Sequence, residues 1–177
     1  MVLFIEKQLL VIDGYNVIGN WPHLNQMKLD NRLADARDEL LKEISEYKKY
    51  RELNIIVIFD AMYVPGLSRK DKHYNLDVIW TNKNETADSY IESFVRKKQS
   101  RFLQVVVVTS DQAEQWTVFS AGALRLPARE LLRDIQRAKT EIQHDVKSYK
   151  NQGKVIRNTI PPEQMMVLEK LRDDLSK

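Results

Sequence analysis

Four short, largely uninterrupted apolar runs constrain the fold of this chain more than any other feature of its sequence. They are rich in valine and isoleucine and occupy residues 8–12, 54–59, 76–80 and 104–108. Half-exposed strands alternate apolar and polar residues, whereas parallel strands that are covered on both faces read as continuous apolar runs. The runs therefore predict strands of a parallel sheet that is buried between two layers.

Helical patterns separate these runs. The spacing of apolar residues predicts helices over residues 30–50, 85–98, 112–123, 126–150 and 161–175. Strands that alternate with helices indicate an α/β protein, so we expect a three-layer α/β/α sandwich with a mostly parallel central sheet. The expected domain covers residues 1–150, and residues 151–177 form a C-terminal extension with an amphipathic helix.

Composition excludes several classes of function. The chain of 177 residues has no cysteine, so it has no thiol nucleophile, disulfide or zinc–thiolate site. We find no apolar run of about 18 residues and no signal peptide, so we expect a cytoplasmic protein without a membrane partner. The net charge is only +3, but residues 96–101 hold four positive charges and no negative one. Basic segments beside clustered acids suit a polyanionic substrate that requires a metal ion.

Acidic residues follow the ends of the predicted strands. Asp13, Asp60 and Asp111 come within three residues of strand ends, and Asp88 lies at a helix start with Glu85 as a secondary residue. Because parallel strands end at one edge of a sheet, we expect these side chains to converge there. Clustered carboxylates repel one another, and oxygen ligands favour Mg²⁺ or Mn²⁺. The pattern predicts a site for one or two such ions.

Each acid also has a structural explanation. Asp13 before Gly14 is good turn chemistry, and Asp111 is a candidate helix cap. Asp88 and its neighbouring acid suit the dipole of their helix, and Asp60 is compatible with a simple strand end. The coincidence of several acids at strand ends favours the metal site over these separate explanations.

Other catalytic machinery is absent from the sequence. There is no glycine-rich phosphate loop and no sign of a serine–histidine–acid triad, and the histidines (His23, His73 and His144) are scattered. An aspartyl phosphatase needs a second acid two residues after Asp13, where this chain has Tyr15. What is left is metal-assisted attack of water on a phosphodiester.

Five motifs in order resemble those of the NYN-domain ribonucleases of the PIN-like superfamily. They are DGYN at 13–16, VIFDA at 57–61, NETAD at 84–88, TSD at 109–111 and GALRLPARELLRDI at 122–135. The resemblance covers about residues 8–145 and is strongest to a bacterial branch that contains a ribosome-associated messenger RNA endonuclease.

This resemblance implies a PIN-like fold and a metal-dependent endoribonuclease that cleaves single-stranded RNA. Messenger RNA is then the expected substrate, with the ribosome as a candidate partner. By motif, Asp13 and Asp88 are similar to the principal catalytic metal ligands, and Asp60 and Asp111 to supporting ones. Asn16 resembles the asparagine that holds the first aspartate or a metal-bound water.

Basic residues in two segments are candidates for RNA binding. Arg125 and Arg129 match the basic positions of the GALRLPARELL motif, and Arg133 continues a stripe along one face of the same helix. The alternative is that these arginines pair with neighbouring acids or solvate the helix. The loop 61–75 adds further candidates, which are Arg69, Lys70 and Lys72, with Tyr63 and Tyr74 as candidates for base stacking. Trp21 is a further candidate for stacking, whereas Trp80 and Trp116 are assigned to the core.

Two rival functions use the same features. The first is a catalytically silent RNA-binding or ribosome-docking module on this fold. The second is a metal-dependent phosphohydrolase or DNA nuclease, because the sequence distinguishes RNA from DNA poorly.

Overall fold

The computed structural model describes residues 7–61, 70–100, 102–111, 120 and 122–159. Side chains are described for residues 8–61, 74–100, 102–111, 120 and 122–143. Contacts divide the chain into two units, residues 1–136 and 137–177. This boundary falls earlier in the chain than the sequence-based boundary at residue 150.

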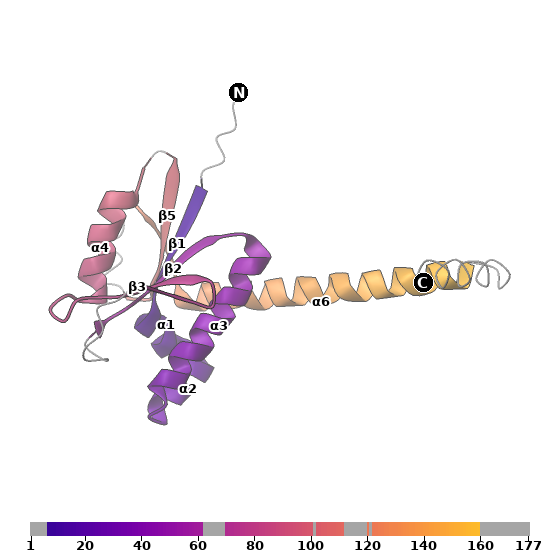
Figure 1. Ribbon diagram of the computed structural model, residues 1–177, viewed down its shortest axis with the longest axis horizontal. Coiled ribbons are helices and arrows are strands. Elements are labelled where there is room, and N and C mark those ends of the chain that lie inside the picture. Colours follow the sequence, from indigo (N-terminus) through magenta and orange to yellow (C-terminus); the bar gives the residue numbers. More distant parts are fainter. Residues whose placement is uncertain (1–6, 62–69, 101, 112–119, 121, 160–177) are drawn as a thin grey trace, which may run out of the picture. The chain divides into compact units, whose positions relative to one another are not determined.

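A six-stranded sheet forms the centre of the first unit (Figure 1). Its strand order is β3-β4-β2-β1-β5-β6, and every neighbouring pair except β3 and β4 is parallel. The strands are β1 (Lys7–Asp13), β2 (Asn54–Phe59), β3 (Lys70–His73), β4 (Leu76–Trp80), β5 (Leu103–Val108) and β6 (Leu124–Leu126). The predicted mostly parallel sheet is confirmed, and β3 and β6 are strands that the apolar runs did not reveal.

Among the residues that the structure describes, three helices lie between β1 and β2, one lies between β4 and β5, and one follows β6. They are α1 (Gly14–Asn20), α2 (Pro22–Leu29), α3 (Leu33–Arg51), α4 (Ala87–Lys98) and α6 (Ala128–Thr159). The sequence pattern located α3, α4 and the start of α6 to within a few residues but missed α1 and α2. The helix predicted at 112–123 lies largely outside the described residues, and the one at 161–175 lies entirely outside them.

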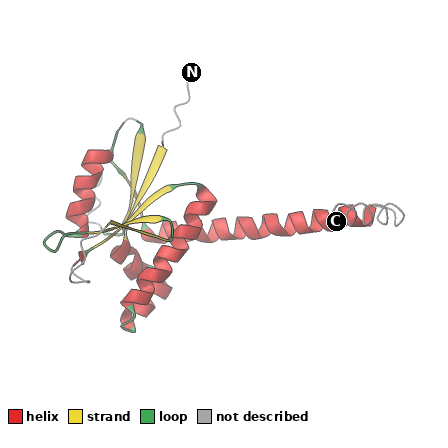
Figure 2. Ribbon diagram, in the orientation of Figure 1, coloured by secondary structure: helices red, strands yellow, loops and turns green. Residues whose placement is uncertain are grey.

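Helices cover both faces of the sheet in the first unit (Figure 2). Ile91 and Val95 of α4 join a core cluster that includes Val11 of β1 and Val107 of β5. On α3, which follows α1 and α2 on the other side, Leu40 and its apolar neighbours are fully buried. Each fully buried aliphatic side chain stabilises the fold by roughly 1.5–3 kcal/mol. The arrangement is the expected three-layer α/β/α sandwich.

No helix in the described part of the chain is long and apolar enough to cross a membrane.

A close contact joins the start of α1 to the end of β2. A Cβ atom on Gly14 would lie 2.2 Å from the nearest ring carbon of Phe59. The Phe59 ring is fully buried, stacks on Trp80 at a centroid distance of 5.0 Å and meets the edge of Tyr15 at 5.1 Å. Because aromatic neighbours hold the ring, it cannot easily move aside. Only glycine fits directly after Asp13.

Gly14→Ala is therefore expected to lower the free energy of unfolding by about 1–3 kcal/mol through overpacking. Urea denaturation measures the change. Gly19→Ala is the matched control, because Gly19 lies in the same helix and a Cβ there meets nothing within 4 Å. Alanine is favoured over glycine in a helix by roughly 0.5–1 kcal/mol, so this variant should be as stable as the parent or more so. Equal losses in both variants would contradict the packing argument.

Candidate active site

The site lies where the chain reverses its direction across the sheet. From β1 the chain proceeds to β2 and β4 on one side, and later to β5 and β6 on the other. In open parallel sheets such a switch point opens a crevice at the carboxyl ends of the strands, where ligands bind. Asp13 is the last residue of β1, the strand at this point.

Local structure holds the Asp13 carboxylate at the start of a helix. Asp13 has an extended backbone and serves as the N-cap of α1, where its Oδ1 accepts a hydrogen bond from the backbone N–H of Asn16 over 3.1 Å. Such a cap satisfies one of the free amides of the first helical turn. Only 6% of Asp13 is exposed. The cap and the candidate functional carboxylate are therefore the same group.

The pKa of Asp13 is raised from 3.8 to about 6, chiefly by burial. The negative charges of Asp88 and Asp60 contribute to this rise, whereas hydrogen bonds from the amides of Asn16 and Tyr15 oppose it. Two of the predicted acids thus act on a third, Asp13, at the carboxyl edge. This mutual repulsion is what an added cation would relieve.

Hydrogen bonds between the ends of β2 and β4 hold the backbone around Asp60 in position. It directly follows β2 and is half-buried. The next amide, that of Ala61, donates to Oγ1 of the buried Thr81 over 3.0 Å. The amide of Thr81 in turn donates to the carbonyl of Phe59. Thr81 was not singled out from the sequence, although a threonine directly after a buried strand is a usable signal for such a tie.

Asp88 comes from the first turn of α4. Thr86 caps this helix by accepting a hydrogen bond from the amide of Ser89 over 3.2 Å. Asp88 is exposed. Glu85 is half-buried just before the cap and accepts a hydrogen bond from the side chain of Asn82. Glu85 is also one of the causes that raise the pKa of Tyr90, after burial.

Asn16 links the two halves of the sheet. Its Oδ1 accepts a hydrogen bond from the amide of Ser110 over 2.8 Å, and the side chain of Asn20 donates to the same oxygen. Its own backbone N–H donates to Asp13. Asn16 therefore holds the first aspartate through its main chain, while its side chain binds the end of β5.

The segment after β5 brings a further acid and a base to this edge. Asp111 is exposed, and its amide donates to Oγ1 of Thr109. Nε of Arg125 donates to the carbonyl of Thr109 over 3.0 Å. Ser110 accepts a hydrogen bond from the amide of Ala128 at the start of α6. Arg125, predicted as an RNA-binding residue, therefore has its guanidinium beside the strand end.

The structure gives less information about the other predicted RNA-binding residues. Arg129 and Arg133 are exposed on α6. Arg69 and Tyr63 lie outside the described residues, as do the side chains of Lys70 and Lys72 on β3.

Two tryptophan assignments need correction. Trp21 is fully buried, and its Nε1 donates to the carbonyl of Ala128 over 2.8 Å, so it cannot stack a base. Trp80, which was assigned to the core, is only half-buried at the end of β4. Trp116 lies outside the described residues.

The acids at this edge are compatible with a magnesium-type ion that keeps several of its waters. In the part of the chain that the structure describes, no three acidic, histidine or cysteine side chains are arranged to hold a metal ion directly. Mg²⁺ usually binds through one or two carboxylates and keeps several waters. A buried carboxylate with two further acids in electrostatic reach is compatible with that mode.

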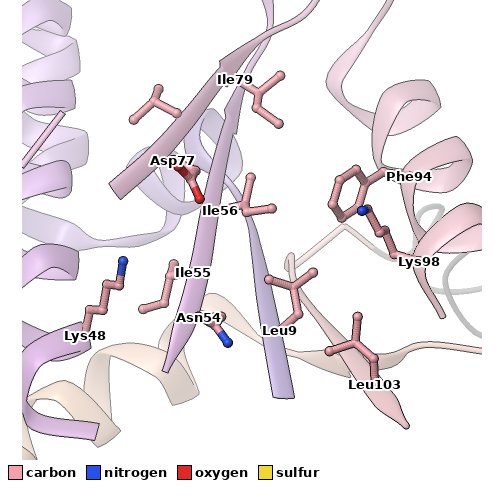
Figure 3. A pocket seen from close by; sticks show the side chains of 11 residues that line it. Leu9, Lys48, Asn54, Ile55, Ile56, Asp77, Ile79, Phe94, Lys98 and Leu103 are labelled. Atoms are coloured by element: carbon pink, nitrogen blue, oxygen red, sulfur yellow. The ribbon is translucent and has the colours of Figure 1, made fainter. Parts of the chain in front are cut away.

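A pocket of about 570 Å³ lies at the opposite, amino end of the strands (Figure 3). Its lining includes Leu9, Ile56 and Leu103 near the starts of their strands, with Lys48 and Lys98 from the ends of α3 and α4. This pocket is therefore separate from the acidic edge.

The sandwich with acids at the carboxyl edge of its sheet defines a protein of the NYN class, whose domains are of nuclease type. Residues 10–173 match the YacP-like NYN domain. The chain belongs to the YacP-like NYN domain family.

Proteins similar to this chain are found in Bacillus subtilis. YacP of strain 168 is 38% identical over 164 residues, which cover 93% of this chain and 96% of that protein. The crystal structure of Rae1 (YacP) matches with a TM-score of 0.69 and 38% identity, covering 95% of this chain and 97% of that one. A second crystal structure, of a point mutant of Rae1, has a TM-score of 0.69 and 39% identity, covering 80% of this chain and 82% of the mutant chain.

The raised pKa of Asp13 has a consequence for stability without divalent cations. The native pKa of about 6 exceeds the unfolded value of 3.8, so the native state binds more protons between these values. The contribution of Asp13 to stability is therefore greatest below about pH 4 and is lost as the pH rises through 6, by up to about 3 kcal/mol in total. Asp13→Asn lacks this loss but keeps an oxygen for the cap.

We expect the stability of Asp13→Asn relative to the parent to increase from pH 4 to pH 7.5, as measured by urea denaturation in EDTA. Asp77→Asn is the control, because Asp77 is an exposed aspartate near the other end of β4. Its difference from the parent should stay nearly flat. A flat profile for Asp13→Asn as well would mean that the carboxylate is not destabilised by burial.

Proposed function

We propose that this protein is a metal-dependent endoribonuclease that cleaves single-stranded RNA. Messenger RNA is the proposed substrate, and the ribosome is a candidate partner. The observation that carries the proposal is the buried Asp13 carboxylate at the switch point, within electrostatic reach of Asp88 and Asp60. Membership of a nuclease-type family supports the same reaction class.

The proposed ligands of Mg²⁺ or Mn²⁺ are Asp13, Asp88 and Asp60, with Asp111 in a supporting role. A divalent ion there supplies positive charge against the acids and the phosphodiester, and lowers the pKa of the attacking water.

The protein's own residues hold this arrangement in place. The amides of Tyr15 and Asn16 stabilise the charged form of Asp13. The bond from Ser110 to Asn16 keeps β5 against α1, so Asp13 and the residues after β5 keep their relative positions. Acids set on strand ends and a helix start are positioned more accurately than acids on long loops.

Substrate binding needs positive charge beside the acids. Arg125 is held at the edge by its bond to Thr109, and Arg129 and Arg133 follow on exposed positions of α6. Guanidinium groups bind phosphate in a bidentate manner, which suits the backbone of RNA. RNA is favoured as the substrate, and the ribosome as the partner, through the resemblance of the motifs to the ribonuclease branch.

A paired cleavage assay tests the function. A labelled messenger RNA, free and on translating ribosomes, is incubated with the parent, Asp13→Asn, Asp88→Asn and Asp77→Asn in Mg²⁺ or Mn²⁺. The parent and Asp77→Asn should cut, and EDTA should stop them. Asp13→Asn and Asp88→Asn should cut about 100-fold more slowly, because charge that stabilises the transition state is lost.

Cleavage by Asp13→Asn at the parental rate would refute the site. Binding without cuts by every variant would favour the silent docking module. Cuts on a matched DNA oligonucleotide at the same rate would favour the DNA nuclease.

A further inference from the structure

An arginine supported by aromatic rings lies beside the acidic edge. Nη1 of Arg37, on α3, donates to the hydroxyl of Tyr15 over 3.0 Å. The Arg37 guanidinium carbon lies 5.4 Å from the centroid of the Trp80 ring. Phe59 packs between Tyr15 and Trp80 and contacts both rings. We call Arg37, Tyr15, Phe59 and Trp80 the arginine platform.

Within the part of the chain that the structure describes, no carboxylate neutralises the charge of Arg37. Among the described residues, the ion pairs of α3 involve other side chains, and no acid lies within 4.0 Å of the Arg37 nitrogens. The residue is half-buried. A guanidinium has five N–H donors, and one bond to a phenol leaves most of them available. The cation–π contact with the Trp80 ring helps to hold the group without using its donors.

The position of the platform connects it with the active site. Tyr15 is two residues after Asp13, Phe59 directly precedes Asp60, and Trp80 is the last residue of β4. All three rings therefore belong to the carboxyl edge of the sheet. The Arg37 guanidinium is held at that edge beside the acids, which are the proposed ligands of a metal ion. A polyanion could therefore contact the guanidinium and the metal ion at the same time.

Arg37 and Arg125 lie on opposite sides of Asp13. In the strand order, Trp80 belongs to β4, two positions from β1 on one side, and Arg125 belongs to β6, two positions away on the other. With strands about 4.8 Å apart, β4 and β6 are each roughly 10 Å from β1 along the edge, and the Arg125 guanidinium reaches back toward β1 to the carbonyl that follows β5. These distances allow one extended strand of nucleic acid to reach both arginines while crossing Asp13.

We propose that Arg37 is an RNA-binding residue that contacts a backbone phosphate on the β4 side of the scissile one. The RNA strand crosses the carboxyl ends of the strands from β4 to β6, and Arg125 binds it on the far side. This inference rests on the proposed function, because it takes RNA as the substrate. A purely structural role, in which Arg37 only joins α3 to α1 and β4, is the competing explanation.

The dependence of binding on salt separates the two explanations. Each phosphate contact that is lost lowers the slope of log Kd against log salt by about 0.7 for single strands. The full chain carrying Asp13→Asn, which should not cut, is titrated with a fluorescent single-stranded RNA oligonucleotide from 50 to 300 mM salt, in Mg²⁺. Arg37→Gln, added to Asp13→Asn, should weaken binding roughly tenfold and reduce the slope by about 0.7.

Two further variants control the result. Lys42→Gln removes one positive charge from an exposed position of α3 and should change Kd less than twofold, with the slope unaltered. Arg37→Lys keeps the charge, so it should retain most of the slope, with weaker binding because lysine lacks the planar, multidentate donors of the guanidinium. The melting temperature of each variant is measured in parallel.

An unchanged slope in Arg37→Gln with a lowered melting temperature would overturn the proposal in favour of the structural role. So would a slope change of equal size in Lys42→Gln. Cleavage is read separately, with Asp13 restored: Arg37→Gln should raise KM about tenfold with kcat nearly unchanged. An unchanged slope in Arg37→Gln, with RNA cleavage by the parent intact, refutes only the role of Arg37. A normal salt effect in a parent that does not cut RNA refutes the nuclease but not the binding site.

Discussion

The rest of the site depends on one unfavourable arrangement, a carboxylate buried at the end of the central strand. Burial and the charges of Asp88 and Asp60 oppose ionisation of Asp13, and two amides of α1 favour it. Those amides are available only because α1 begins immediately after β1. The immediate start of α1 requires Gly14, since Phe59 occupies the space where a side chain would be. The DGYN segment is thus at once a strand end, a helix cap and a candidate metal ligand.

Polar side chains at the other strand ends hold the adjacent segments in fixed positions relative to this carboxylate. Asn16 binds the amide that follows β5, Ser110 binds the start of α6, and Thr81 binds the amide after Asp60. Each of these groups satisfies a main-chain donor that no strand or helix partner would satisfy. Buried or half-buried donors are costly when left unpaired, so these bonds limit the movement of the edge on which the acids lie.

Much of the fold could be predicted because its signals are local. The runs at 54–59 and 76–80 coincide with β2 and β4, since continuous Val and Ile residues have few alternatives to a buried strand. The two helices after β1 were missed because each is short and neither shows a long apolar stripe. Strands β3 and β6 were missed for a related reason: each is only a few residues long and acquires its identity by pairing with a neighbour.

The sequence by itself determined the four longer strands and the acids at or after the ends of three of them, because strand propensity and chain order are properties of neighbouring residues. Only the tertiary structure decided that Asp88 and Asp60 act on Asp13, because the start of α4 and the end of β2 bring these residues to the end of β1 from distant parts of the chain. The tertiary structure also decided which tryptophan is buried and which lies near the candidate site. Trp21 is buried and bound to a distant carbonyl, and Trp80 supports the guanidinium of Arg37. Contacts between residues far apart in the chain leave no periodic trace in the sequence, so the fold had to supply them.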